Sequence, residues 1–183
     1  MGSATDAPGR YHSVAIVLHW LVAIGVLFMI GLGWSMVDIP KGTPERTFYF
    51  NLHKSIGVTL GVLVLIRLWW RATHRPPPLP AAMTAWEVSA ARINHALLYA
   101  CLLIMPVVGF IASNFTKFGV KYFGIQIGPF FPENQAVRDA LQEVHEITAG
   151  VLAVLVILHV LAAFKHLIVD KDGVFQRMLP RSR

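Results

Sequence analysis

Four long apolar stretches constrain the fold of this chain more than any other feature. Each approaches the length of a helix that crosses the hydrocarbon layer of a membrane, which takes about 20 predominantly apolar residues. Their uncharged parts are residues 11–37, 55–66, 93–116 and 147–164. Charged residues make up only 14% of the 183 residues and hydrophobic residues 55%. The composition therefore favours a membrane protein over a soluble one.

These stretches predict an all-α membrane protein, a single domain over residues 1–183 built as a bundle of four transmembrane helices. The expected helices run over about residues 12–37, 48–72, 90–115 and 137–169. The connection before the fourth helix, "FGIQIGPFFPEN", is broken by Gly and Pro and is partly apolar. We therefore expect this connection to lie on the membrane surface.

The distribution of basic residues predicts the orientation of the chain, because short cytoplasmic segments are enriched in Lys and Arg. One side of the predicted bundle carries both termini and the loop after the second helix. This side has ten basic and four acidic residues, whereas the other side has six of each. The ten are Arg10, Arg67, Arg71, Arg75, Arg92, Lys165, Lys171, Arg177, Arg181 and Arg183. Both termini are therefore expected in the cytoplasm.

The spread of these cations over helix ends and loops argues against nucleic-acid binding.

Histidines inside the apolar stretches give the strongest indication of function, because an ionisable residue is costly within a bilayer. Four of the eight histidines fall at two matching depths. His19 and His159 lie near the cytoplasmic face, and His53 and His145 lie near the opposite face. His145 and His159 are fourteen residues apart, which is nearly four helical turns. They therefore share one side of the fourth helix and lie about 21 Å apart.

Paired imidazoles from facing helices are suited to hold a haem iron from both sides within a helical bundle. Zinc or copper fits less well, because two histidines without thiolate or carboxylate partners complete no tetrahedral site. Gly57 and Gly61 follow His53 by one and two turns and leave room for a flat macrocycle, although small residues also let membrane helices approach closely. We predict two haem groups within the bundle. The expected iron ligands are His19, His53, His145 and His159. A small transporter with a histidine proton relay is the alternative without haem.

Other polar residues near the cytoplasmic face are weaker candidates. Arg67 and Arg71 are candidates to bind haem propionates, because guanidinium pairs well with carboxylate, or they extend to the lipid interface. His95 opens the third helix, where we expect either a structural hydrogen bond or a contact with a quinone or a propionate. His12 and His166 each lie seven residues from a proposed ligand, so one interpretation pairs them at the interface.

Several motifs, in order along nearly the whole chain, resemble the bacterial cytochrome b561 family. They are "LHWL" (18–21), "LHKSIG" (52–57) followed by "LIRLWWR" (65–71), "INHALLY" (93–99), "VHE" (144–146) and "LHVLAAFKHLIVDKDGVFQRML" (158–179). The resemblance implies a multi-pass protein of the bacterial inner membrane with two b-type haems, one near each face. The family's haem ligands map onto the four histidines named above.

The resemblance also implies a function in electron transport linked to the quinone pool. A related group is thought to oxidise superoxide at the periplasmic face and to reduce ubiquinone, which makes this chain a candidate oxidoreductase of the same kind. Lys54 and Arg46, with Lys121, would then attract an anionic donor, or they are cations at the lipid headgroups. The alternative function is a haem b electron-conduit subunit for a dehydrogenase, a hydrogenase or a soluble redox partner.

Overall fold

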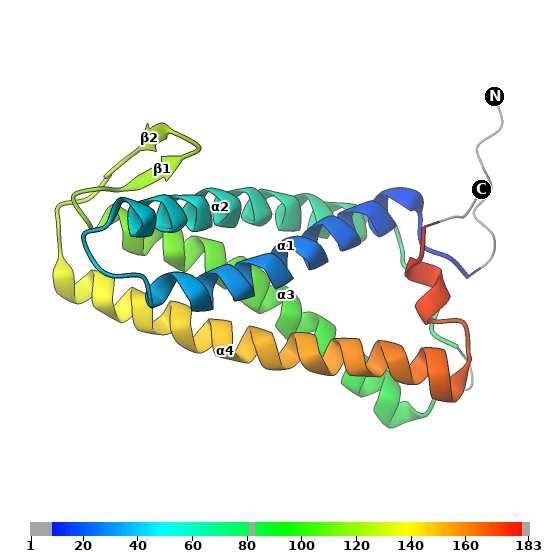
Figure 1. Ribbon diagram of the computed structural model, residues 1–183. Coiled ribbons are helices and arrows are strands. Elements are labelled where there is room, and N and C mark those ends of the chain that lie inside the picture. The colour runs from blue at the N-terminus through cyan, green and yellow to red at the C-terminus, as the bar shows by residue number, and fades with distance from the viewer. Residues whose placement is uncertain (1–8, 81–82, 181–183) are drawn as a thin grey trace.

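The computed structural model describes residues 9–80 and 83–180 and contains four long helices (Figure 1). These are α1 (Ser13–Val37), α2 (Pro44–Thr73), α3 (Ala85–Asn114) and α4 (Gln135–Lys165). The strands β1 (Val120–Tyr122) and β2 (Ile125–Ile127) lie between α3 and α4. After α4 come a π-helical turn, η1 (His166–Asp170), and a 3-10 turn, η2 (Phe175–Met178). Arg181 and Arg183, counted above among the basic residues, lie outside the described residues.

All four helices are long and apolar enough to cross a membrane, which confirms the predicted four-helix membrane fold. They contain 25 to 31 residues, so they are about 37–46 Å long and exceed a hydrocarbon layer of about 30 Å. Many large apolar side chains are exposed on the surface of the bundle, among them Leu27, Val62 and Ile157. Such a surface is expected where the surrounding solvent is lipid.

Three helices, α2, α3 and α4, begin earlier than expected, α4 by only two residues, because polar caps extend them beyond the apolar stretches. The hydroxyl of Thr43 accepts a hydrogen bond from the N–H of Arg46 and so starts α2 at Pro44, a residue favoured in the first turn. The carboxylate of Glu87 accepts hydrogen bonds from the backbone N–H and the hydroxyl of Thr84 at the start of α3. Hydropathy alone misses these first turns since they are polar.

The helices pack in sequence order, α1 on α2, α2 on α3 and α3 on α4. Within the part of the chain that the structure describes, the backbone of α4 hardly approaches that of α1 or α2. Buried side chains from all four helices form one central cluster. Its members are Val22, Val26, Val64, Cys101, Leu152 and Leu155.

A small antiparallel hairpin, β1–β2, departs from the all-α prediction. Its register pairs Val120 with Ile127 and Tyr122 with Ile125. The hairpin lies beside α2 at the end of the bundle where α1 ends and α2 begins (Figure 1). We call this end the hairpin end, and the opposite end, where α1 begins and α4 finishes, the terminal end. The fully buried Asn114 holds the segment that follows β2, because its Oδ1 accepts a hydrogen bond from the N–H of Phe130 at 3.2 Å.

Candidate functional site

Two pairs of imidazole rings face each other across the bundle, one pair near each end. At the terminal end, the ring centroids of His19 on α1 and His159 on α4 are 6.1 Å apart. At the hairpin end, those of His53 on α2 and His145 on α4 are 6.2 Å apart. The structure therefore brings together the four histidines that the sequence singled out. Each pair connects α4 to a helix whose backbone α4 hardly approaches.

The spacing of each pair fits a metal ion held between the two rings. A metal–imidazole bond is about 2 Å long and a ring centroid lies about 1 Å behind its nitrogen, so two axial imidazoles place their centroids about 6 Å apart. The observed separations of 6.1 and 6.2 Å agree with this value. Haem leaves only two axial positions for protein ligands, and each level of the bundle supplies two imidazoles.

The ring nitrogens at the hairpin end also fit a ligand role. The Nδ1 atoms of His53 and His145 are buried, and neither makes a well-formed hydrogen bond in the described structure, although the Met105 carbonyl lies close to the His145 ring. Metal-bound histidines commonly direct this second N–H at a carbonyl or a carboxylate. Two glycines give the rings room, because a Cβ at Gly109 would lie 3.1 Å from Cε1 of His145 and one at Gly33 would lie 3.5 Å from Cε1 of His53.

At the terminal end, polar side chains surround the histidine pair. Arg67 directs Nη2 at Nδ1 of His19 at 3.3 Å and donates from Nη1 to the Ala15 carbonyl at 2.9 Å. The ring of His95 lies 5.3 Å from that of His159, between centroids. Nδ1 of His95 lies 2.7 Å from the Ala91 carbonyl and is well placed to donate to it. The structure thus places Arg67 and His95, both singled out from the sequence, against the terminal pair.

A cavity of about 220 Å³ opens at the terminal end, and one of its lining residues is Arg67, which contacts His19. The charged and aromatic side chains that line it include those of Arg10, Arg67, Trp70, Arg71, Arg75 and Tyr99. The guanidinium of Arg71 lies 5.8 Å from the centroid of the Tyr99 ring. Nε1 of Trp70 is buried and has no hydrogen-bond partner among the described residues. Guanidinium groups only donate, so the four arginines of this wall suit an anionic group.

Two of the three cations singled out at the hairpin end bind backbone carbonyls. Nζ of Lys54 donates to the carbonyl of Gly119 at 3.0 Å and so holds the base of the hairpin. The guanidinium of Arg46 donates to the carbonyls of Val37 and Ile39 and closes the end of α1. Lys121 is exposed on the hairpin. All three cations therefore lie at one end of the bundle, and two of them also have structural contacts.

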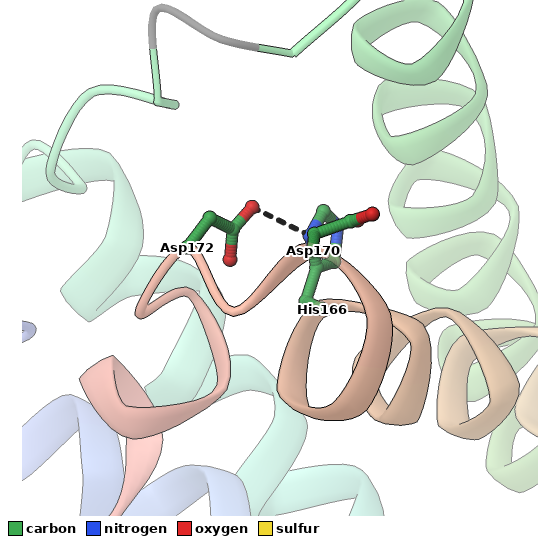
Figure 2. A group of neighbouring side chains, drawn as sticks. All are labelled: His166, Asp170 and Asp172. Carbon is green, nitrogen blue, oxygen red and sulfur yellow. Dashed lines mark hydrogen bonds and ion pairs between the residues drawn. The ribbon is translucent and has the colours of Figure 1, made fainter.

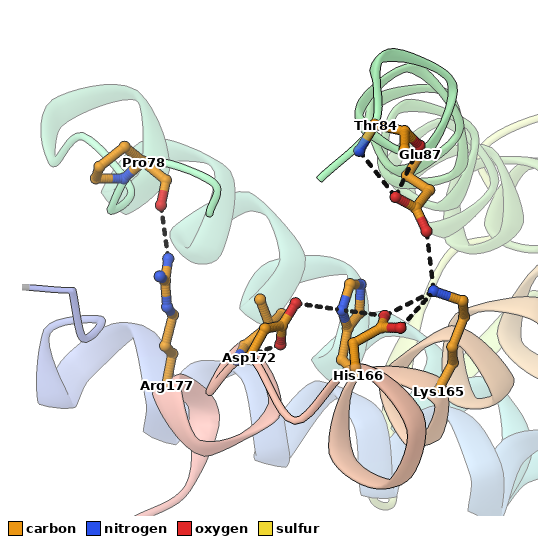
Figure 3. A network of polar contacts seen from close by, with 9 residues as sticks. Pro78, Thr84, Glu87, Lys165, His166, Asp172 and Arg177 are labelled. Atoms are coloured by element: carbon orange, nitrogen blue, oxygen red, sulfur yellow. Dashed lines mark hydrogen bonds and ion pairs between the residues drawn. The ribbon is translucent and has the colours of Figure 1, made fainter. Parts of the chain in front are cut away.

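A histidine and two aspartates gather beyond the end of α4, in a group that the sequence analysis missed (Figure 2). Nδ1 of His166 lies 2.8 Å from a carboxylate oxygen of Asp172 and 3.2 Å from one of Asp170. The ammonium of Lys165 binds both carboxylate oxygens of Asp170 and reaches Glu87 at 2.9 Å (Figure 3). The charged side chains of this group thus pair with one another, and the contact between Lys165 and Glu87 joins the end of α4 to the start of α3. The spacing His-x3-Asp-x-Asp in the sequence was the signal for it.

The interfacial pair considered for His12 and His166 does not form in the described structure. Nδ1 of His12 accepts the N–H of Val14 and caps α1, and its ring lies 5.1 Å from that of Trp70. His166 is instead held by the aspartates. Both residues therefore have local structural partners.

The comparison with known protein families decides the relationship. Residues 10–181 match the family model described as prokaryotic cytochrome b561. The chain belongs to the prokaryotic cytochrome b561 family. It is similar to cytochrome b561 homolog 2 of Escherichia coli (strain K12), with 33% identity over 182 residues that cover 98% of this chain and 96% of the relative. It is also similar to cytochrome b561 homolog 1 of the same organism, with 28% identity over 178 residues that cover 95% of this chain and 99% of the relative.

The general function of the protein follows from its membership of the cytochrome b561 family. The protein is a multi-pass inner-membrane cytochrome that binds b-type haem and takes part in electron transfer. The facing imidazoles are the groups in the described structure whose spacing and chemistry fit such a haem.

Proposed function

We propose that this cytochrome b561 holds two b-type haems and transfers electrons between a donor at the hairpin end and the membrane quinone pool. His53 and His145 are the proposed ligands at the hairpin end, and His19 and His159 those at the terminal end. The observation that carries the proposal is the pair of facing imidazoles at each of two levels, 6.1 and 6.2 Å apart between centroids. Bound haem supplies one-electron redox chemistry that no amino-acid side chain here provides.

The protein's own contribution is to position the imidazoles and to set their protonation. A histidine that binds iron through Nε2 carries its proton on Nδ1. For His145, the nearby Met105 carbonyl is suited to receive this proton in a hydrogen bond. If His19 held iron in this way, its protonated Nδ1 would not accept from Arg67, and Nη2 of Arg67 would be available to another partner while Nη1 keeps the Ala15 carbonyl.

That partner is proposed to be a haem propionate. Arg67 and Arg71 both line the cavity at the terminal end, together with Arg10 and Arg75. Carboxylates pair strongly with guanidinium groups in such surroundings. His95 is proposed to contact a propionate or the quinone, because its Nδ1 is occupied by the Ala91 carbonyl and only Nε2 is left.

The proposed donor is a small anion such as superoxide, and ubiquinone or a related quinone is the proposed acceptor. Lys54 and Arg46 contribute positive charge at the hairpin end, and long-range attraction depends on charge even where the side chain also binds a carbonyl. Stopped-flow reduction by superoxide tests this in Lys54→Ala and Arg46→Ala, with Lys171→Ala at the other end as the control. We expect slower reduction and a weaker salt dependence in the first two variants alone. Unchanged rates in all three would refute the attraction.

The haem proposal is tested by redox difference spectra and haem-to-protein ratios of the purified protein. We expect two haems in the wild type and one lost when either member of a pair is changed to Ala. His166→Ala, whose ring is held by Asp170 and Asp172 beyond the end of α4, is the matched control and should keep both haems. A ratio unaffected by the ligand variants would refute the assignment. Stoichiometric copurification of a dehydrogenase would instead assign the chain as an electron-conduit subunit.

The proposed orientation places both termini in the cytoplasm, in line with the excess of Arg and Lys at the terminal end. A fluorescent protein that matures only in the cytoplasm tests this when fused to the C-terminus. We expect fluorescent cells, and dark cells that contain intact fusion protein would reverse the orientation.

A further inference from the structure

The hairpin β1–β2 covers a polar patch on the outward face of α2. The side chain of Ser55 is almost fully buried, at 1% exposure, although α2 turns this face away from His53. Its Oγ accepts the N–H of Phe123 at 2.9 Å and lies 3.1 Å from the carbonyl of Lys121. One turn further along, the hydroxyl of Thr59 lies 3.3 Å from that of Tyr122. Both hydroxyls also lie within hydrogen-bond distance of carbonyls of α2 itself, at 2.8 Å for Ser55 and 3.0 Å for Thr59, so the hairpin covers this polar patch and adds to its hydrogen bonds.

The same face of α2 becomes apolar and exposed beyond the hairpin. Val62, Ile66 and Trp69 follow Ser55 by 7, 11 and 14 residues and so lie on one face with it. Their exposed fractions are 53%, 43% and 63%. Since α2 crosses the membrane, this face contacts lipid. The hairpin therefore lies in line with this lipid-facing surface of α2 and extends it to the hairpin end.

Contacts between α1 and α2 fix the depth of the hairpin. A Cβ at Gly33 would meet His53, and a Cβ at Gly57 would meet Met29, so the two antiparallel helices are level at these positions. Ser55 is therefore level with a point on α1 midway between Met29 and Gly33. This point lies six residues before the last residue of α1, or about 9 Å along the helix.

This depth falls within the membrane interface. The hydrocarbon layer takes about 20 of the 25 residues of α1. If α1 is centred in the layer, its boundary lies about 4 Å from the end of the helix, which leaves the backbone of Phe123 about 5 Å inside the boundary. Interfacial segments commonly lie about 5–10 Å deep. Their backbone needs internal hydrogen bonds, which strand pairing and Ser55 provide.

The exposed side chains of the hairpin are apolar at its tip and include cations only farther from the tip. Phe123 and Ile125 form the tip, which is the part nearest the membrane centre, and are 59% and 67% exposed. Lys121 and Gln126 form the next pair and are also exposed. At the base, the exposed Lys117 lies 5.2 Å from the centroid of the Phe118 ring. Phe118 itself is 69% exposed, so apolar side chains lie both at the tip and at the base, whereas the cations Lys121 and Lys117 lie only nearer the membrane surface, where they can reach lipid phosphates.

We propose that the hairpin is a membrane-interface wedge that binds the lipid leaflet at the hairpin end. The side chains of Phe123 and Ile125 insert among the acyl chains, and Lys121 extends to the phosphates. The wedge involves neither the haems nor the electron donor, so its test is separate from that of the proposed function.

Collision measurements on nitroxide labels test the wedge. The full-length protein is labelled at Phe123→Cys, Ile125→Cys, Gln126→Cys or Lys41→Cys and reconstituted in vesicles of phosphatidylethanolamine and phosphatidylglycerol. Lys41 lies in the exposed turn between α1 and α2 and is the matched water-exposed control. The wild type, whose buried Cys101 is the sole cysteine of the sequence, measures background labelling. Circular dichroism and gel filtration confirm that each variant is folded.

We expect the ratio of oxygen collisions to nickel-chelate collisions to be several-fold higher at positions 123 and 125 than at position 41, with position 126 between them. Tip labels with the same ratio as position 41 would overturn the wedge, because the hairpin would then lie in water. Tip labels accessible to neither reagent would also overturn it, since a second copy of the chain or a protein partner would then cover them.

Discussion

Replacing Gly109 by Ala tests whether α3 holds the His145 ring in its position. A Cβ at residue 109 would lie 3.1 Å from Cε1 and 3.2 Å from Nδ1 of His145. Carbon atoms in ordinary contact are about 3.5–4.0 Å apart, so the ring has to move by about 0.5 Å. Metal–ligand distances tolerate deviations of only about 0.2 Å. The substitution therefore displaces a proposed haem ligand by more than the bond allows.

The expected result is loss of haem at the hairpin end without loss of helix. Disturbing the groups that orient a metal ligand typically lowers metal affinity by about 10–100-fold. Meanwhile Gly→Ala in a helix interior stabilises the helix by about 0.5–1 kcal/mol. The two effects have opposite signs, so a lower haem content in Gly109→Ala cannot be attributed to a weaker α3.

The assay is the haem-to-protein ratio and the reduced-minus-oxidised spectrum of the purified protein. Two other glycines provide graded controls, because a Cβ at Gly33 would meet Cε1 of His53 at an ordinary 3.5 Å and one at Gly150 would meet nothing within 4 Å. We expect Gly33→Ala and Gly150→Ala to keep the wild-type ratio. A wild-type ratio and spectrum in Gly109→Ala would refute the reasoning, and equal loss in all three variants would indicate a general effect of alanine.

Three further substitutions test the contacts that shape the bundle. Ser55→Ala removes the acceptor of the Phe123 N–H, so deuterium exchange at that amide should become faster, and an unchanged rate would contradict the contact. Asn114→Ala leaves the Phe130 N–H without its acceptor, so the free energy of unfolding in detergent should fall by about 1–3 kcal/mol, and a neutral result would argue against the bond. Thr84→Ala removes a helix cap and should cost about 1 kcal/mol by thermal unfolding, whereas Thr84→Ser should be neutral.

The four-helix membrane fold was predictable because hydropathy acts over long segments. An apolar stretch that matches the thickness of the bilayer has few alternatives to a membrane helix. The depth of a histidine then follows from its position along such a stretch. His145 and His159 lie on one side of α4 because a helix has a fixed period, so the pairing of four histidines was predictable from spacing.

The rest depends on short-range contacts that a single sequence does not specify. The hairpin has strands of only three residues, and its tip places Phe123 at a φ of 43°, where Gly or Asn is usual. The bond from Lys54 to Gly119 and the contact between His95 and His159 each join residues far apart in the chain. Which partners such side chains choose depends on how the helices rotate against one another, and that rotation follows from packing.

Helix α4 carries one imidazole for each level, and this has a consequence for how such sequences evolve. Between His145 and His159, each inserted or deleted residue rotates one histidine relative to the other by about 100° and shifts it by about 1.5 Å. Only changes close to whole turns would keep both rings facing their partners on α1 and α2. The number of residues between the two histidines is therefore constrained by the geometry of the helix. We expect the loops of relatives to vary in length, whereas the segment between these histidines should keep its thirteen residues.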